Sequence, residues 1–189
     1  TAMNLVGSLD IPTKGNIFLD GKDISRFTES EVAQLRGSKI GFIFQSFNLI
    51  PNLTAKENVM LPMLFQGIMR EKREQRAQEL LSMIDLKDRM GHYPSQLSGG
   101  QQQIVAIARS LANDPEVILA EEPTGNLDTQ TGEKVMQFLQ ELHNKGRTII
   151  MVTHDPEKAK TYAKTIYWIK DGRVEQVTKR HGGVWKKVR

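Results

Sequence analysis

The sequence predicts an α/β fold in which a mostly parallel sheet is flanked by helices and carries an inserted helical lobe. Apolar, β-rich runs alternate with segments of helical periodicity along most of the chain. The runs VILA and TIIMV are separated by one helical segment, as expected for parallel strands joined by a crossover. Between Gln45 and Ser98 the pattern is helical throughout, so residues 46–97 are expected to form the lobe.

Length and composition predict one soluble globular domain over residues 1–189. The chain has 189 residues, of which 39% are hydrophobic and 25% charged, and no apolar run approaches the roughly 18 residues of a membrane span. The absence of cysteine excludes disulfides and thiolate metal sites and favours the cytosol. The net charge of +4 is compatible with nucleic acid, an anionic membrane or a phosphate-bearing ligand and does not choose among them.

The segments before and within the lobe have clear local signals. The stretch NIFLDGKDI predicts a hairpin around Asp20-Gly21, because Asp-Gly is a preferred two-residue turn. The run KIGFIFQ predicts a strand that ends at Gln45. Thr54 and Glu57 have the spacing of a capping box and predict a helix over residues 55–66. The stretch EKREQRAQELLSMI repeats apolar positions at helical spacing and predicts a second helix.

The segments after the lobe complete the predicted fold. A helix from about Gly132 to Asn144 connects the two parallel strands. The stretch KTIYWIKDGRVEQV predicts a closing hairpin over Asp171-Gly172. Residues 177–189 form a basic tail that we expect to be a solvated end.

Two adjacent acids, Glu121 and Glu122, follow the first of the parallel strands. Open α/β sheets place ligand sites at the carboxyl ends of their strands. In a purely structural interpretation, one acid caps the next turn and the other points to solvent. In a functional interpretation, one carboxylate holds a metal ion through water while the other orients or deprotonates an attacking water.

The stretch LSGGQQQIVAIARSLANDP predicts a helix with a special beginning. Ser98 can cap this helix, and the two glycines that follow allow close approach of a ligand to the backbone. Backbone N–H groups at the positive end of the helix then form an anion site, although an ordinary N-cap fits the same residues. Val105, Ala108 and Leu111 have the spacing of a core face.

Taken together, these motifs resemble those of the nucleotide-binding subunits of ATP-binding cassette (ABC) transporters. The chain carries GFIFQSFNLIPNLTAKENV, LSGGQQQ, ILAEEPTGNLD and VTHD in the order of that family, from Thr1 to about Val174. The resemblance implies a P-loop NTPase-type sheet, with ATP and Mg²⁺ as cofactors. PTGNLD and FNLIPNLTAKENV are most similar to the branch that serves lipoprotein release and macrolide export.

The resemblance implies a role for each site residue. Glu122 would position and activate water, and His154 would hydrogen-bond the γ-phosphate. Gln45 would sense the magnesium ion and the water, and Glu121 would take the metal position. The remaining residues implied to bind nucleotide are Thr1, Ser98, Gly99, Gly100, Gln101 and Asp128.

The resemblance also implies partners and a location. Two subunits would face each other head to tail, so that Ser98 and Gly100 of one contact the γ-phosphate held by the other. Asp128 would tie the two halves together. A groove beside residues 47–53 would receive a helix of an integral membrane permease, on the inner face of the cell membrane. No specific nucleic acid is expected.

The sequence departs from the family at three points. Glu121 stands where the family has Asp, and its longer arm puts the octahedral geometry of magnesium in question. Ile104 stands where Arg or Lys is usual. The phosphate loop is missing: the family's loop ends Gly-Lys-Ser-Thr and runs into a helix like TAMNLVGSLDIPTKG, so Thr1 would be its last residue. The chain is therefore expected to begin within that loop and to be inactive as given.

Two other classes of function remain open. A chromosome-maintenance or repair ATPase of the same superfamily would carry a long coiled-coil or zinc insertion between Gln45 and Ser98, and this sequence has none. A non-catalytic fragment or regulatory binding module is favoured by the missing loop and by Glu121.

Overall fold

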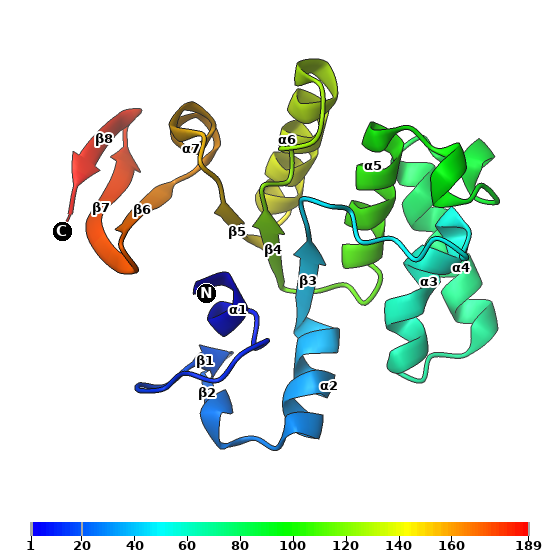
Figure 1. Ribbon diagram of the computed structural model, residues 1–189, viewed down its shortest axis with the longest axis horizontal. Helices are drawn as coiled ribbons and strands as arrows, with labels where there is room; N and C mark the ends of the chain where they lie inside the picture. Colours follow the sequence, from blue (N-terminus) through cyan, green and yellow to red (C-terminus); the bar gives the residue numbers. More distant parts are fainter. Residues whose placement is uncertain (1, 20, 189) are drawn as a thin grey trace. The chain divides into compact units, whose positions relative to one another are not determined.

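The computed structural model describes residues 2–19 and 21–188. They form two compact units that divide between Val152 and Thr153, and each unit is described by itself (Figure 1). Among these residues no helix is both long enough and apolar enough to cross a membrane. The assignment of residues 1–189 to one functional domain stays a prediction.

The first unit is built around a three-stranded parallel sheet in the order β3-β4-β5 (Figure 1). Its strands are β3 (Ile40–Ile43), β4 (Val117–Glu121) and β5 (Thr148–Val152). The central strand is the most buried, because Ile118, Leu119 and Ala120 have no solvent exposure. The parallel pair VILA and TIIMV is thereby confirmed. The expected end of β3 at Gln45 is wrong by two residues, because the chain turns at Phe44, whose carbonyl accepts a hydrogen bond from the amide of Phe47.

Two long helices connect and cover this sheet. Helix α5 (Gly99–Ser110) packs against β3, and its predicted core residues Val105, Ala108 and Leu111 are buried. Helix α6 (Thr129–Asn144) is the crossover between β4 and β5. It begins three residues before the expected Gly132, because the carboxylate of Asp128 caps it.

The lobe is helical, as predicted, between Gln45 and Ser98. It contains α3 (Ala55–Phe65), α4 (Arg70–Met83) and two single 3-10 turns, Lys87–Arg89 and Pro94–Gln96. The capping box of Thr54 and Glu57 is present at the start of α3. Helix α3 packs against both α4 and α5, so the lobe shares its core with α5.

The segment before the sheet differs from the expected long first helix. Helix α1 (Ala2–Val6) ends where Ser8 takes a left-handed φ of 55°, and the amide of Leu9 closes the end on the carbonyl of Asn4. The hairpin follows as strands β1 (Phe18–Leu19) and β2 (Lys22–Asp23), which confirms its position. A 3-10 turn, Ile24–Arg26, and helix α2 (Glu29–Lys39) lead into β3; the sequence analysis did not assign α2.

The second unit consists of helix α7 and an antiparallel sheet in the order β6-β7-β8. Its elements are α7 (Pro156–Tyr162), β6 (Thr165–Lys170), β7 (Arg173–His181) and β8 (Val184–Lys187). The hairpin over Asp171-Gly172 is confirmed.

The basic tail is mostly exposed, as expected of a solvated end, but it is folded into strands. Val177 and Thr178 are buried in β7, and residues 184–187 add a third strand. Gly182 and Gly183 both have positive φ angles, of 55° and 84°, and supply the tight turn that joins β7 to β8.

Candidate functional site

The two acids lie at the carboxyl end of the central strand, as predicted. Glu121 is the last residue of β4, pairs with Val152 and is exposed. Glu122 follows with a left-handed φ of 42°, a conformation that costs about 1–3 kcal/mol for a residue with a side chain. Its amide donates to the carbonyl of Val152 (2.9 Å), and its own carbonyl accepts from the amide of Gly125 (2.9 Å). Backbone bonds on both sides therefore hold Glu122 in this conformation.

Gln45 lies against the turn that begins at Glu122. A Cβ atom added to Gly125 would come within 2.9 Å of the Gln45 Nε2 atom and 3.4 Å of its Cδ and Cγ atoms. The side-chain amide of Asn126 donates to the carbonyl oxygen of Gln45 at 2.9 Å. The structure therefore brings together Gln45 and the segment after Glu122, two parts of the site predicted from separate motifs.

The beginning of α5 has the cap predicted for it. The amide of Gln101 donates to the Ser98 hydroxyl (3.2 Å), and the amide of Ser98 donates to the Gln101 side chain (3.0 Å). The amides of Gly99 and Gly100 have no acceptor within the helix, since these are its first two residues. They are donors that an anion can use.

Both glycines of this motif lie close to other parts of the site. A Cβ on Gly100 would lie 2.6 Å from the Thr131 methyl group. A Cβ on Gly99 would lie 3.8 Å from the ring of Phe47, whose side chain is half-buried. The start of α5 is therefore packed between the segment after Gln45 and the start of α6.

Asp128 caps helix α6. Its carboxylate accepts a hydrogen bond from the amide of Thr131 at 3.0 Å. Hydrogen bonds from the Thr131 side chain and then from its backbone hold the pKa of the Asp128 carboxyl below its usual range. The side chain is otherwise exposed.

Two predicted residues, His154 and Thr1, are not described as part of this cluster. His154 is exposed and belongs to the second unit, two residues after the end of β5 along the chain. Thr1 lies outside the described residues.

The oxygen donors of the site are the hard ligands that Mg²⁺ prefers. Among the described residues, no three His, Cys, Asp or Glu side chains are grouped closely enough to hold a metal ion. Mg²⁺ is usually held by one or two protein oxygens, with phosphates and water completing its octahedron. Glu121 and Gln45 fit that smaller set.

Arg109 is a site residue that the sequence analysis missed. Its guanidinium, on α5, donates to the carbonyl oxygens of Phe47 (2.8 Å) and Asn48 (2.5 Å). These two residues have left-handed φ angles of 57° and 49°. Burial lowers the pKa of Arg109. Its only sequence signal is a single arginine within the apolar run IVAIARSLA.

Gln103 is a second residue that was missed. Its side chain is 1% exposed, and its amide donates to the carbonyl oxygen of Pro123 at 2.7 Å. Pro123 directly follows Glu122, so α5 is fixed to the turn of the candidate catalytic residue by a buried hydrogen bond.

A cavity of about 780 Å³ lies in the same unit, between α2, β3, α3 and α5. Its walls include the apolar side chains of α3, and Phe65 at the end of that helix is 78% exposed. Of residues 47–53, which we expected to border a docking groove, Asn48 lines this cavity. Arg109, which binds the carbonyl of Asn48, lines it as well.

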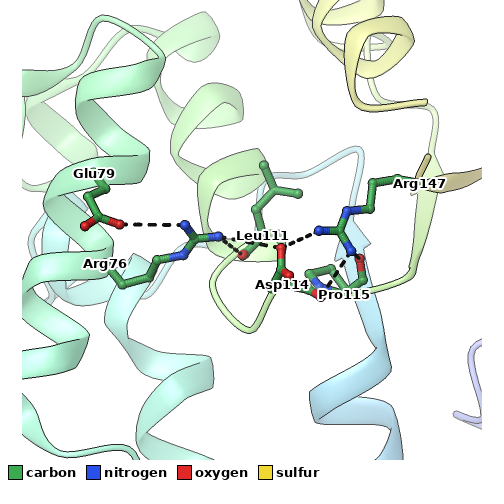
Figure 2. Close-up of polar contacts among 6 residues, drawn as sticks. All are labelled: Arg76, Glu79, Leu111, Asp114, Pro115 and Arg147. Atoms are coloured by element: carbon green, nitrogen blue, oxygen red, sulfur yellow. Dashed lines mark hydrogen bonds and ion pairs between the residues drawn. The ribbon is translucent and has the colours of Figure 1, made fainter. Parts of the chain in front are cut away.

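An ion cluster around Asp114 joins the lobe to the sheet (Figure 2). Figure 2 shows Arg76 of α4 between Glu79 and Asp114. The guanidinium nitrogens of Arg76 are 3.7 Å from the Glu79 carboxylate and 3.9 Å from the Asp114 carboxylate. Arg147 reaches the same Asp114 carboxylate from the loop before β5 and also donates to the Pro115 carbonyl at 2.9 Å. Helix α4 and the loop before β5 therefore both bind the Asp114 carboxylate, which lies in the loop between α5 and β4.

The chain is similar to several known proteins. Residues 1–125 match the family described as ABC transporter. An ABC transporter ATP-binding protein of Thermotoga maritima is 51% identical over 180 residues, which are 95% of this chain and 76% of that protein. The macrolide export ATP-binding/permease protein MacB of a Shewanella species is 52% identical over 172 residues, or 91% of this chain and 26% of that protein. A dimeric post-hydrolysis structure of the cassette MJ0796 of Methanocaldococcus jannaschii, bound to ADP and Pi, superimposes with a TM-score of 0.86. Its sequence identity is 47%, and the match covers 96% of this chain and 80% of that one.

Proposed function

We propose that this chain, which belongs to the ABC transporter family and is an ATP-binding subunit of that kind, hydrolyses ATP with Glu122 as its catalytic residue. The observation that carries the proposal is the position of Glu122 at the carboxyl end of the central strand, with Gln45 against the turn that follows. A carboxylate at this place in an open α/β sheet is suited to act on a bound phosphate group.

The chemistry divides among few residues. Glu122 accepts the proton of the attacking water, and the Gln45 amide orients that water. His154 donates a hydrogen bond to the γ-phosphate. Glu121 and Gln45 are the residues that would hold Mg²⁺, which supplies charge neutralisation at the phosphate oxygens when bound. Thr1 belongs to the nucleotide site in the same proposal.

The start of α5 serves a second copy of the chain. The capping box orders Ser98 and Gln101, and the free amides of Gly99 and Gly100 present an anion site at the positive end of the helix. In a head-to-tail dimer this site receives the γ-phosphate held by the other copy, and Asp128 lies at the junction. The dimeric cassette MJ0796, solved with ADP and Pi, supports this arrangement.

The cavity beside α3 receives a helix of a membrane permease. Its apolar wall and the exposed Phe65 suit the apolar face of a helix. The relative MacB, named an ATP-binding/permease protein, joins the two activities in one chain and supports this partner. The chain then works on the inner face of the cell membrane.

Nucleotide-dependent dimerisation tests the proposed site. Residues 1–189 contain no glycine-rich loop ending Gly-Lys-Ser. The test therefore uses an extended polypeptide, in which a strand and such a loop are joined to the N-terminal side of residues 1–189. With Glu122→Gln, ATP is expected to produce a dimer in sedimentation velocity. Ser98→Glu should abolish the dimer, because it places a negative charge at the anion site.

Ser82→Glu is the matched control, since Ser82 is exposed on α4. A dimer that persists in Ser98→Glu, or that Ser82→Glu also abolishes, contradicts the proposed role of the start of α5. An extended polypeptide that does not bind ATP contradicts the nucleotide site itself.

A further inference from the structure

Asn126 is bonded to the main chain of Gln45. Its Nδ2 group donates to the Gln45 carbonyl oxygen at 2.9 Å, across 81 residues of sequence. The bond reaches a backbone atom, so it fixes the peptide plane from which the Gln45 side chain extends. Gln45 itself lies beyond the end of β3, where no sheet hydrogen bond holds it.

The donor residue, Asn126, is itself held in place by the hydrogen bonds of its neighbours. Asn126 follows the turn in which Gly125 donates to the Glu122 carbonyl (2.9 Å), and Leu127 donates to the Thr124 carbonyl (3.3 Å). Asp128, two residues after Asn126, caps helix α6. Asn126 therefore stands between two ordered segments.

The Gln45 side chain is held by shape on the same side. The missing Cβ of Gly125 leaves the space that the Gln45 amide occupies, since a Cβ there would be 2.9 Å from Nε2. The hydrogen bond from Asn126 and the contact with Gly125 therefore place the Gln45 side chain against the turn that begins at Glu122.

A second set of hydrogen bonds lies farther along the loop. Arg109 binds the carbonyl oxygens of Phe47 and Asn48 but does not bind Gln45. Asn126 thus supplies the side-chain hydrogen bond to the main chain of Gln45, and Arg109 supplies those to Phe47 and Asn48. Asn126 is exposed, whereas the Arg109 contact to Phe47 is partly buried.

We infer that Asn126 is a positioning residue for hydrolysis, which sets where the Gln45 amide lies relative to the turn that begins at Glu122. The inference deepens the proposed function and rests on it for the catalytic consequence. The structural part, that Asn126 orders residues 44–48, stands on the hydrogen bond alone.

Hydrogen exchange of the 189-residue chain tests the structural part. Asn126→Asp keeps the shape but replaces the donor by an acceptor that faces the Gln45 carbonyl, and Asn126→Ala removes the group without adding charge. In both, amide exchange of residues 44–48 should rise about 2- to 12-fold, the range expected for one lost hydrogen bond.

Asn113→Asp is the matched control. The Asn113 amide donates to the Gly37 carbonyl at 2.8 Å, so the same chemistry is removed from another pair of segments. Exchange should then rise near Gly37 and stay unchanged at residues 44–48. Unchanged exchange at residues 44–48 in both Asn126 variants, or an equal rise there in the control, overturns the inference.

Steady-state kinetics of the extended polypeptide test the catalytic part. Asn126→Asp should lower kcat about tenfold, because the displaced Gln45 amide no longer orients the attacking water. Asn126→Ser, which restores a shorter donor, should recover part of kcat. A raised KM with unchanged kcat overturns the positioning role. If the unsubstituted extended polypeptide hydrolyses no ATP, the proposed function fails, while the exchange result still decides whether Asn126 orders the loop.

Discussion

The guanidinium of Arg109 donates a 2.8 Å hydrogen bond to the carbonyl oxygen of Phe47, 62 residues earlier in the chain. The same group binds Asn48, and both acceptor residues have left-handed backbones. A half-buried cation thus holds together the strained loop that follows Gln45.

Replacing Arg109 by Met should destabilise the chain by about 2–4 kcal/mol. The substitution keeps the aliphatic stem but removes two charge-assisted hydrogen bonds, each contributing about 1.5–3 kcal/mol, and lets the strained backbone relax. Urea unfolding measures the change. Arg36→Met is the control: Arg36 binds only the Ser8 carbonyl in the described chain, so its loss should cost less than half as much. Equal costs would show that Arg109 has no special role in the loop.

The close contact between Gly100 and Thr131 predicts that a side chain at residue 100 destabilises the chain and that a smaller side chain at residue 131 restores its stability. Gly100→Ala should destabilise the chain by about 1–3 kcal/mol, because its Cβ would lie 2.6 Å from the Thr131 methyl group. Gly99→Ala, whose Cβ would lie 3.8 Å from the Phe47 ring, should change stability by less than about 0.5 kcal/mol. Adding Thr131→Ser to Gly100→Ala removes the methyl group and should restore stability. If Thr131→Ser does not restore the midpoint of thermal unfolding, the contact with the Thr131 methyl group is not the cause of the destabilisation.

The cap of α6 predicts a pH dependence. Hydrogen bonds from Thr131 lower the pKa of Asp128 in the folded chain, so its carboxylate stabilises the fold above the unfolded pKa of about 3.9. That stabilisation is lost as pH falls through the folded pKa. Asp128→Asn keeps a capping oxygen without the titration. The stability difference between parent and Asp128→Asn should be constant above about pH 5 and change only below it. A difference that changes between pH 6 and 8 would contradict this assignment.

The cavity beside α3 predicts where the permease binds. Phe65→Asp should abolish co-purification with the permease while circular dichroism stays unchanged, because Phe65 is 78% exposed and contributes little to the core. Met83→Asp serves as the control, since Met83 is 57% exposed on α4 and does not line the cavity. Phe47 is a poorer test, because its ring is half-buried against Gly99. Retained binding by Phe65→Asp would remove this cavity from the proposal.

The features that could be predicted from sequence follow short-range rules. The capping box at Thr54, the helix cap at Ser98 and the hairpin at Asp171-Gly172 depend on residues within a few positions of each other, and all three are present. Strand β8 was missed because its lysines outweighed the turn signal of the two preceding glycines.

The missed site residues act over long separations. Asn126 and Arg109 bind carbonyl oxygens that lie 81 and 61–62 residues away. A main-chain carbonyl is present at every residue, so no complementary residue type marks the partner in the sequence. The three-dimensional fold alone identifies these contacts.

The central claim is that Glu122 is the base that activates water. In the extended polypeptide, Glu122→Gln keeps the shape and hydrogen bonding of the side chain but removes its basicity, so the rate of ATP hydrolysis should fall about 100-fold or more. Glu133→Gln is the matched control, because Glu133 is exposed on α6, and its rate should equal that of the parent. The direct measurement is phosphate release at saturating ATP. A large loss in Glu122→Gln alone agrees with the claim, and equal rates in Glu122→Gln and the parent would contradict it.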